Sequence, residues 1–257
     1  MSLKQKILSV YNWAHLSPDK TNLNQKRIRD IEWDAVKPFI ISGKFLDVGC
    51  GAGYTMNQAM VYADCTVWGI DPDPGGHGVG RMGQDFGIDK SRISTGFAED
   101  LPYESNFFDT LYSSHVLEHV MDEHKSLSEM NRVMKQDGVL IIGMPTATMA
   151  TINLLTSYFF TSHQKLLNLL LGRFISVGKV RWWEIIIPPS HSFSNKTVIY
   201  DLRKYRVKNW KRLLENHFRV EEVLLPALYP YPEYRQWFPL HRNKKRSSSV
   251  FFICRKK

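Results

Sequence analysis

Apolar and polar positions follow two alternating periods along the first 146 residues. Short apolar runs predict strands at 44–48, 66–70, 93–95, 110–113 and 139–143. Stretches with helical spacing lie between them, at 53–62, 78–86 and 118–134. Strands that alternate with helices at this spacing predict a parallel sheet covered on both faces. Ligands of such sheets bind at the carboxyl ends of the strands.

The pattern changes on both sides of this core. Residues 4–40 predict helices that break near Ser17-Pro18-Asp19 and cover the mouth or edge of the sheet. Residues 147–190 form an aromatic-rich amphipathic segment, interrupted by glycines, which predicts a helical insertion that caps the active site. The remaining segments predict a helix at 209–216 and strands at 219–224 and 250–254.

These segments predict one domain over residues 1–257, with the fold class α/β. Its sheet is expected to be doubly wound, mostly parallel and seven-stranded. Its four parts are N-terminal helices at 1–40, a cofactor-binding core at 41–146, the cap insertion at 147–190 and the C-terminal part of the sheet at 191–257. The composition, 43% hydrophobic and 23% charged, is that of a globular chain.

The net charge of +9 is concentrated at one end of the chain. Residues 195–257 hold 16 Lys and Arg against 5 Asp and Glu, whereas residues 1–194 hold 18 against 20. This asymmetry favours an anionic partner, which could be a substrate, a nucleic acid or an acidic membrane face, or else a solvated basic surface. The charge alone does not choose between them.

The cysteines and the hydrophobic runs indicate a cellular compartment. Cys50, Cys65 and Cys254 lack the spacing of a metal site or a disulfide framework. No run approaches the ~18 apolar residues that span a bilayer, and the amino terminus lacks the apolar core of a secretory signal. We therefore expect no metal and a cytoplasmic protein, with peripheral membrane contact left open.

The segment Asp47-Val48-Gly49-Cys50-Gly51-Ala52-Gly53 leaves a predicted strand and enters a predicted helix. Glycines in this context allow a sharp turn and a close approach of the backbone to a nucleotide. The next strand ends in Asp71, whose carboxylate can accept hydrogen bonds from both hydroxyls of a ribose. The alternative is that Asp71 caps the turn at Asp71-Pro72. Dinucleotide-binding enzymes share this geometry. At this point the loop and Asp71 therefore fit either a dinucleotide-binding enzyme or an enzyme that binds another nucleoside cofactor.

A second set of motifs separates the two classes. It comprises 96–103 (GFAEDLPY), 107–120 (FFDTLYSSHVLEHV) and 129–138 (EMNRVMKQDG). Together with the glycine loop, this set resembles the class I S-adenosylmethionine-dependent methyltransferase family, which includes ubiquinone and menaquinone methyltransferases. The resemblance covers about residues 40–146 and implies a Rossmann-like fold and S-adenosylmethionine as cofactor. Dehydrogenases usually carry a longer glycine fingerprint and lack the second block.

The resemblance also implies roles for individual residues. Asp47 and the backbone of Gly49 and Gly51 would hold the methionine part of the cofactor, Asp71 the ribose, and the Ser113 carbonyl the amino group. Residues 97–99 would frame the adenine. Many relatives carry Asp where this chain has Phe97, so adenine recognition shifts to Glu99 or Asp100. The expected cofactor-binding residues are Asp47, Gly49, Cys50, Gly51, Gly53, Asp71, Pro72, Phe97, Ala98, Glu99 and Ser113.

Three histidines are candidates for the acceptor side of the reaction. His115 and His119 follow the fourth strand, where either could act as general base, and the alternative is that they are structural. His191, in a proline-rich turn after the insertion, is a candidate substrate contact or a surface residue. Methyl transfer needs little from side chains beyond alignment in a dry pocket, because the methyl donor is already activated.

The preferred hypothesis is methylation, at oxygen, of a small or lipid-linked acceptor. The apolar insertion would cover such an acceptor, and the basic C-terminal quarter would meet phosphate or lipid headgroups. Nucleic-acid methylation is the second class, favoured by the charge and by Trp182-Trp183, although no RNA-binding module is recognisable. A cofactor-binding scaffold without turnover is the third. The sequence does not indicate the oligomeric state.

Overall fold

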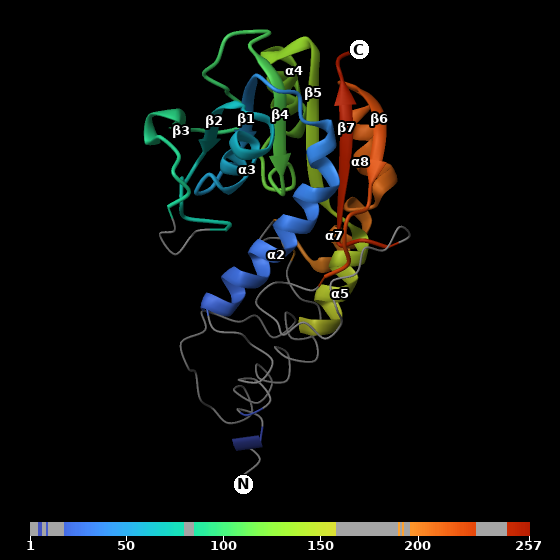
Figure 1. The fold of residues 1–257 in the computed structure, drawn as a ribbon. Helices are drawn as coiled ribbons and strands as arrows, with labels where there is room; N and C mark the ends of the chain where they lie inside the picture. Colours follow the sequence, from blue (N-terminus) through green and yellow to red (C-terminus); the bar gives the residue numbers. More distant parts are fainter. Residues whose placement is uncertain are drawn as a thin grey trace.

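The computed structural model describes residues 5–6, 9, 18–79, 85–157, 190, 192, 196–229 and 246–257. Seven strands form one sheet in the order β3-β2-β1-β4-β5-β7-β6 (Figure 1). The strands are β1 (Lys44–Val48), β2 (Thr66–Asp71), β3 (Ile93–Thr95), β4 (Phe108–Ser114), β5 (Met134–Pro145), β6 (Arg219–Leu224) and β7 (Ser249–Arg255). The first five pair in parallel, and β7 runs antiparallel between β5 and β6. The predicted seven-stranded, mostly parallel sheet is confirmed.

Helices cover both faces of this sheet, as the buried residues show. One core layer includes Met56 and Ala59 of α3 (Tyr54–Ala63) and Trp33 of α2 (Pro18–Val36). The other includes Met130 of α4 (Glu123–Val133) and Trp210 of α8 (Val207–Leu214). The sheet is therefore doubly wound, with its apolar faces buried against helices from both halves of the chain.

The helix α2 reaches across the end of the sheet that holds the carboxyl ends of the parallel strands (Figure 1). Its last turns pack on the core through Trp33 and Val36, 6% and 0% exposed. The short helices η1 (Lys37–Phe39) and η2 (Lys90–Arg92) lead into β1 and β3. None of the helices in the described ranges combines the length and apolar character needed to cross a bilayer.

Three predicted elements differ most from the structure. The helix expected at 118–134 begins only at Glu123, because the Asp122 side chain accepts a hydrogen bond from the Lys125 backbone N–H and caps the helix there. The strand expected at 139–143 begins at Met134, and its pairing with β4 shifts register before Val139. The helix expected at 78–86 is absent at 78–79 and 85–86, which are turn or irregular, while 80–84 lie outside the described residues. Glycines at 78, 80 and 83 disfavour a helix there.

The C-terminal part matches the prediction closely at its strands. The strand β6 spans the predicted 219–224, and the helix predicted at 209–216 is α8, two residues earlier. The helix α7 (Val198–Lys204) has no counterpart in the prediction. The helix α5 (Ala147–Ser157) lies at the start of the predicted cap and contacts α7, whereas residues 158–189 of the cap lie outside the described residues.

Candidate functional site

A cavity of about 560 Å³ opens at the carboxyl ends of β1, β2 and β4. The strand order reverses here, because β1 pairs with β2 on one side and β4 on the other. Ligands of doubly wound sheets bind at such a switch point. The volume is that of a small-molecule site.

The glycine loop forms one wall of the cavity, through Gly49, Cys50 and Gly51. Gly49 and Gly51 have φ values of 84° and 52°, which glycine adopts without strain. A Cβ at Gly51 would lie 2.9 Å from the backbone oxygen of His77, and one at Gly49 would lie 2.1 Å from a methyl group of Val116. The loop is therefore packed so closely that side chains at these two positions are excluded.

Asp71 forms the adjoining wall and is 7% exposed. Its Oδ2 accepts the Gly51 N–H at 2.9 Å, and its Oδ1 accepts the Asp73 N–H at 2.8 Å. The carboxylate thus caps the turn after β2 and also fixes the glycine loop. Because a carboxylate offers about four acceptor positions, it can still receive hydroxyl donors from a ligand.

Asp47 lies in β1 at the floor of the cavity and is 2% exposed. Burial and the neighbouring Asp71 carboxylate raise the pKa of Asp47 to about 8, against an opposing effect of Arg29. A buried carboxyl in this condition favours a cationic ligand, which would stabilise the ionised form.

The structure places the predicted adenine loop apart from this cavity. Phe97 is 65% exposed, Ala98 is buried, and Glu99 uses Oε1 to accept the Met121 backbone N–H at 2.8 Å. None of the three is among the described residues that line the cavity. Two further residues expected to bind the cofactor, Gly53 and Ser113, are also not among those that line the cavity. Gly53 lies in the loop after β1, and Ser113 lies in β4.

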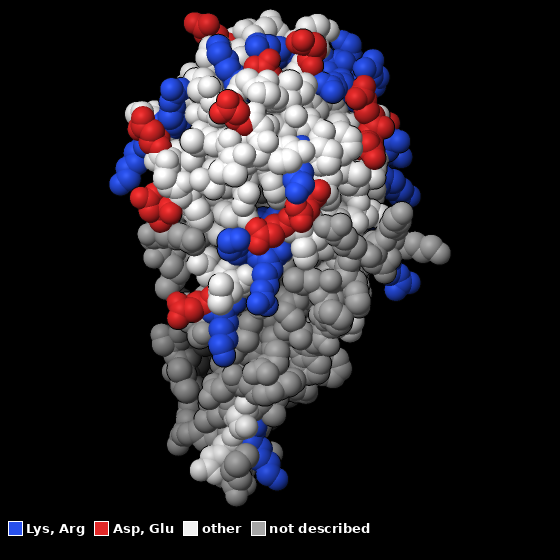
Figure 2. Space-filling view, in the orientation of Figure 1, with Lys and Arg blue, Asp and Glu red and all other residues white. Residues whose placement is uncertain are grey.

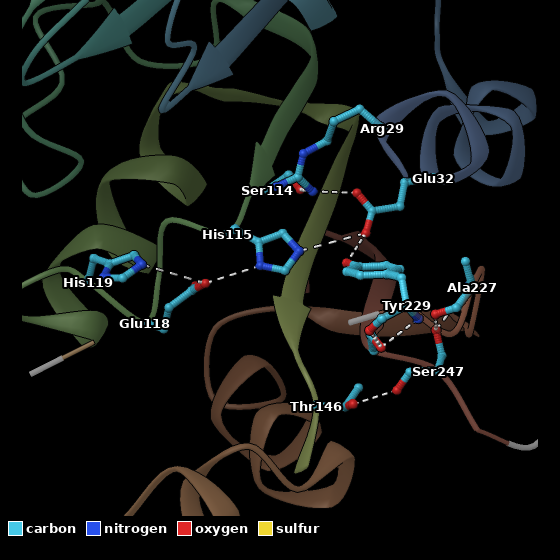
Figure 3. A network of polar contacts seen from close by, with 11 residues as sticks. Arg29, Glu32, Ser114, His115, Glu118, His119, Thr146, Ala227, Tyr229 and Ser247 are labelled. Atoms are coloured by element: carbon cyan, nitrogen blue, oxygen red, sulfur yellow. Dashed lines mark hydrogen bonds and ion pairs between the residues drawn. The ribbon is translucent and has the colours of Figure 1, made fainter. Parts of the chain in front are cut away.

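A buried polar network lies beside the cavity, which its members Arg29, His115 and Tyr229 also line (Figure 3). His115, just after β4, has a φ of 57° and lies between two carboxylates. Its Nδ1 is 3.3 Å from Glu118 Oε1, and its Nε2 is 3.7 Å from Glu32 Oε1, which comes from α2. Glu32 also forms an ion pair with Arg29 and accepts the Tyr229 hydroxyl at 2.7 Å. The network joins segments of the chain separated by 197 residues.

His119 occupies a different position from His115. Its Nε2 lies 3.9 Å from Glu118 Oε1, and its side chain is 43% exposed, against 12% for His115. Both histidines line the cavity. The structure therefore brings them together with the glycine loop and Asp71 around one cavity. His191, the expected substrate contact, lies outside the described residues.

The charges of the network shift the protonation of its members. Burial raises the pKa of Glu32, but Arg29 and His115 more than offset this, and the net pKa lies well below the usual range. Burial and Arg29 lower the pKa of His115, but the two glutamates outweigh them and the net shift is upward. Burial raises the pKa of Glu118, and the histidines reverse this to a net decrease. Charged carboxylates and a charged imidazole are therefore favoured together.

The sequence predicted N-terminal helices over the mouth or edge of the sheet, but it did not identify the α2 residues that line the cavity. Gln25, Ile28 and Arg29 line the cavity, as do Met149 and Tyr229 from later segments. Ile28 and Glu32 are four residues apart and share one helical face, so a charged residue continues a stripe that buries apolar ones. This buried charge was a signal for a polar site, because an unpaired charge is rarely buried. Its partners, His115 and Tyr229, could not be read from local pattern.

Comparison with known sequences identifies methyltransferase relatives of this chain. Residues 46–142 match the family model of the methyltransferase domain. A ubiquinone/menaquinone biosynthesis C-methyltransferase of Citrifermentans bemidjiense is 31% identical over 124 residues, covering 46% of this chain and 53% of that protein. A ubiquinone biosynthesis O-methyltransferase of Pelagibacter ubique is 25% identical over 216 residues, covering 77% and 81%. The chain spans about half the length, or less, of the first curated relatives it matches.

Solved structures show the same fold at low sequence identity. A SAM-dependent methyltransferase of Thermotoga maritima superposes with a TM-score of 0.55 at 17% identity, over 91% of this chain and 92% of that one. This likeness concerns the fold alone.

Proposed function

We propose that this chain, which belongs to the class I S-adenosylmethionine-dependent methyltransferase family, transfers the methyl group of S-adenosylmethionine to an oxygen of a small or lipid-linked acceptor. The observation that carries the proposal is the cavity at the switch point, bounded by Asp71 and by the glycine loop, where Gly49 and Gly51 leave no room for side chains. A nucleoside cofactor needs this combination of close backbone approach and a fixed carboxylate.

The residues present fit S-adenosylmethionine. Asp47, with the backbone of Gly49, Cys50 and Gly51, would hold its methionine part, since the amino group and sulfonium are positive and the Asp47 carboxyl is buried nearby. When bound, the cofactor supplies an activated methyl group. The protein would contribute alignment and exclusion of water, the two effects that such a transfer requires.

The same family pattern assigns the remaining cofactor contacts. Asp71, followed by Pro72, would accept the ribose hydroxyls with the lone pairs that Gly51 and Asp73 leave unused. Gly53 completes the loop, and the Ser113 carbonyl would receive the amino group. Phe97, Ala98 and Glu99 do not line the described cavity, so as the proposed adenine contacts they would extend the site past that lining. Glu99 would use the oxygen that does not accept the Met121 N–H.

His119 is the better placed of the two candidate bases. It lines the cavity and is 43% exposed, and the buried, ionised Glu118 lies 3.9 Å from its Nε2. A carboxylate behind an imidazole fixes its orientation and stabilises the imidazolium that forms when it accepts a proton. Removing a proton from an acceptor hydroxyl is the step that O-methylation needs.

Apolar residues on the acceptor side support a lipid-linked or aromatic acceptor. Ile28, Met149 and Tyr229 form one buried cluster and also line the cavity. The relative that matches over most of both chains is described as a ubiquinone biosynthesis O-methyltransferase, which agrees with this class of acceptor. We propose His191 as a further acceptor contact.

A cytoplasmic location with peripheral membrane contact completes the proposal. The cations proposed for that contact are Arg242, Lys244, Lys245 and Arg246 in the basic C-terminal quarter. The first three lie outside the described residues, and Arg246 lies within them. On the face that Figure 2 shows, the described Lys and Arg side chains are interspersed with Asp and Glu. The basic segment near residues 242–246, rather than this face, is therefore the proposed membrane contact.

A labelling experiment tests the proposed function. The protein is incubated with methyl-labelled S-adenosylmethionine and a cell extract, before and after ribonuclease treatment, and the labelled product is identified. Label in an organic-soluble or small-molecule product that survives ribonuclease supports the proposal. Label lost with ribonuclease would indicate RNA methylation, and binding without label transfer would indicate a scaffold.

A further inference from the structure

His115 is enclosed by carboxylates in a way that a proton acceptor for substrate would not need. Each of its two ring nitrogens faces a different glutamate, Nδ1 toward Glu118 and Nε2 toward Glu32 (Figure 3). Both glutamates are fully buried, with 0% exposed side chains. The Nε2 contact, at 3.7 Å, is an ion-pair contact rather than a hydrogen bond. Carboxylates on both sides of the ring stabilise its doubly protonated form, and an imidazolium has no lone pair that could receive a proton from an acceptor hydroxyl.

The charge balance of the network favours an imidazolium at His115. Glu32 and Glu118 carry two negative charges, and Arg29 supplies one positive charge. A second positive charge on His115 makes the buried group electrically neutral, which is the condition under which buried charges are tolerated. Other titratable groups interact with the partners of His115: Tyr229 and Tyr112 with Glu32, His119 and Tyr205 with Glu118, and Asp47 with Arg29. Burial raises the pKa of the three tyrosines and of Asp47, which favours their neutral forms at pH 7.

The network also connects two elements that both contribute to the lining of the cavity. Glu32 and Arg29 lie on α2, whereas His115 and Glu118 follow β4. Arg29 additionally donates to the Ser114 hydroxyl at 3.3 Å. The left-handed backbone of His115, with its N–H bonded to the Gly143 carbonyl at 2.9 Å, fixes the ring at this junction. The face of α2 held in this way is the one that presents Gln25, Ile28 and Arg29 to the cavity.

We propose that His115 is a positioning residue, an imidazolium clamped between Glu32 and Glu118 that seats α2 over the cavity, and that it takes no proton from the acceptor. This inference rests on the proposed function in one respect, which is that His119 and not His115 removes the proton from the acceptor. The seating of α2 is a property of the protein without any ligand. His115 therefore shapes the acceptor wall, and Glu118, which also neighbours His119, links the two roles.

The first test is made on the unaltered protein. Nitrogen-15 NMR of the histidine side chains, with His115→Asn used to assign the signal, distinguishes imidazolium from neutral imidazole. We expect His115 to show the imidazolium signature at pH 7 and to lose it only at a pH above that of a free histidine. A neutral His115 ring at pH 7 would overturn the proposal.

The second test uses a cation that cannot act as a base. Asn tolerates the left-handed backbone but removes the charge, whereas His115→Lys retains the charge between the glutamates. We expect amide exchange in residues 18–36 to rise at least about tenfold in His115→Asn and to stay within about threefold of wild type in His115→Lys. His119→Asn is the matched control and should leave exchange of α2 unchanged. Equal α2 exchange in His115→Asn and wild type would contradict the clamp.

Activity separates positioning from catalysis. With the labelled acceptor fraction as probe, His115→Lys should retain methyl transfer at pH 7 within about tenfold, while His119→Asn should lose 10²-fold or more. Loss in His115→Lys equal to that in His119→Asn, with α2 exchange intact, would show that His115 is the base. If no variant or wild type transfers methyl, the proposed function fails, and the NMR and exchange results still decide the role of His115.

Discussion

Asp71 Oδ2 accepts the backbone N–H of Gly51 at 2.9 Å and thereby ties the end of β2 to the glycine loop after β1. One carboxylate thus shapes the loop and, in the proposed function, binds the ribose. The two roles share the same buried position at 7% exposure.

Replacing Asp71 with Ala should weaken binding of S-adenosylmethionine and of its demethylated product by roughly 1.5–3 kcal/mol, since the ribose contact is charge-assisted. Titration calorimetry measures both. The matched control is Asp73→Ala, two residues away with a side chain 65% exposed, which should keep wild-type affinity. Unchanged affinity in Asp71→Ala would remove Asp71 from the cofactor site.

Replacing Gly51 with Val should abolish cofactor binding, because the new side chain would meet the His77 backbone and occupy the edge of the cavity. Gly87→Val is the control for backbone strain, since Gly87 also has positive φ, at 70°, but open space around it. Circular dichroism should show both variants folded. If Gly51→Val is folded and still binds tightly, the loop does not approach the cofactor.

Cofactor affinity should rise with pH between about 6 and 8, because the cationic ligand favours the ionised form of Asp47, whose pKa is about 8. The steepest slope is about tenfold per pH unit for one linked proton. The folding stability of the protein without cofactor should change with pH in the opposite direction. Because the pKa of Asp47 is higher in the folded than in the unfolded chain, its contribution to the free energy of unfolding is full below about pH 4 and is lost as pH rises through 8. Asp47→Asn should flatten both dependences. A pH-independent affinity in wild type would show that Asp47 does not respond to the ligand.

The local sequence pattern was sufficient to predict most helices and strands. It was insufficient to predict the side-chain contacts between them. Strand β1 was predicted with the bounds observed, because its apolar run is bordered by polar and glycine residues. The start of α4 was missed, because a side-chain cap at Asp122 overrides the helical pattern of residues 118–121. Asp47 and Asp71 could be predicted because each ends or lies in a strand that leads to one edge of the sheet. The contacts among Glu32, His115 and Tyr229 depend on the tertiary structure, and no sequence spacing encodes them.

Replacing Glu32 with Gln should destabilise the protein by about 3–5 kcal/mol, because Arg29 and His115 would lose their buried counter-charge. Denaturant unfolding measures the change. The control is Asp34→Asn on the same helix, whose ion pair with Lys37 is exposed and should contribute about 1 kcal/mol or less. The part of the stability that depends on His115 should be present below pH 6.5 and be lost as pH rises through its elevated pKa. Equal stability of Glu32→Gln and wild type would show that the network contributes nothing net.

Changing Arg242, Lys244, Lys245 and Arg246 to serine should reduce sedimentation with anionic vesicles, since each cation near such a surface contributes about 1 kcal/mol and salt screens it. Neutral vesicles are the control. A wild-type protein indifferent to vesicle charge would leave a soluble acceptor as the substrate.

The central claim is that the cavity between the glycine loop and Asp71 holds S-adenosylmethionine. Parallel calorimetric titrations of the wild-type protein with S-adenosylmethionine, its demethylated product and NAD measure this most directly. We expect saturable one-to-one binding of the first two and no binding of NAD. Preferential binding of NAD, or no binding of S-adenosylmethionine by the folded protein, would contradict it.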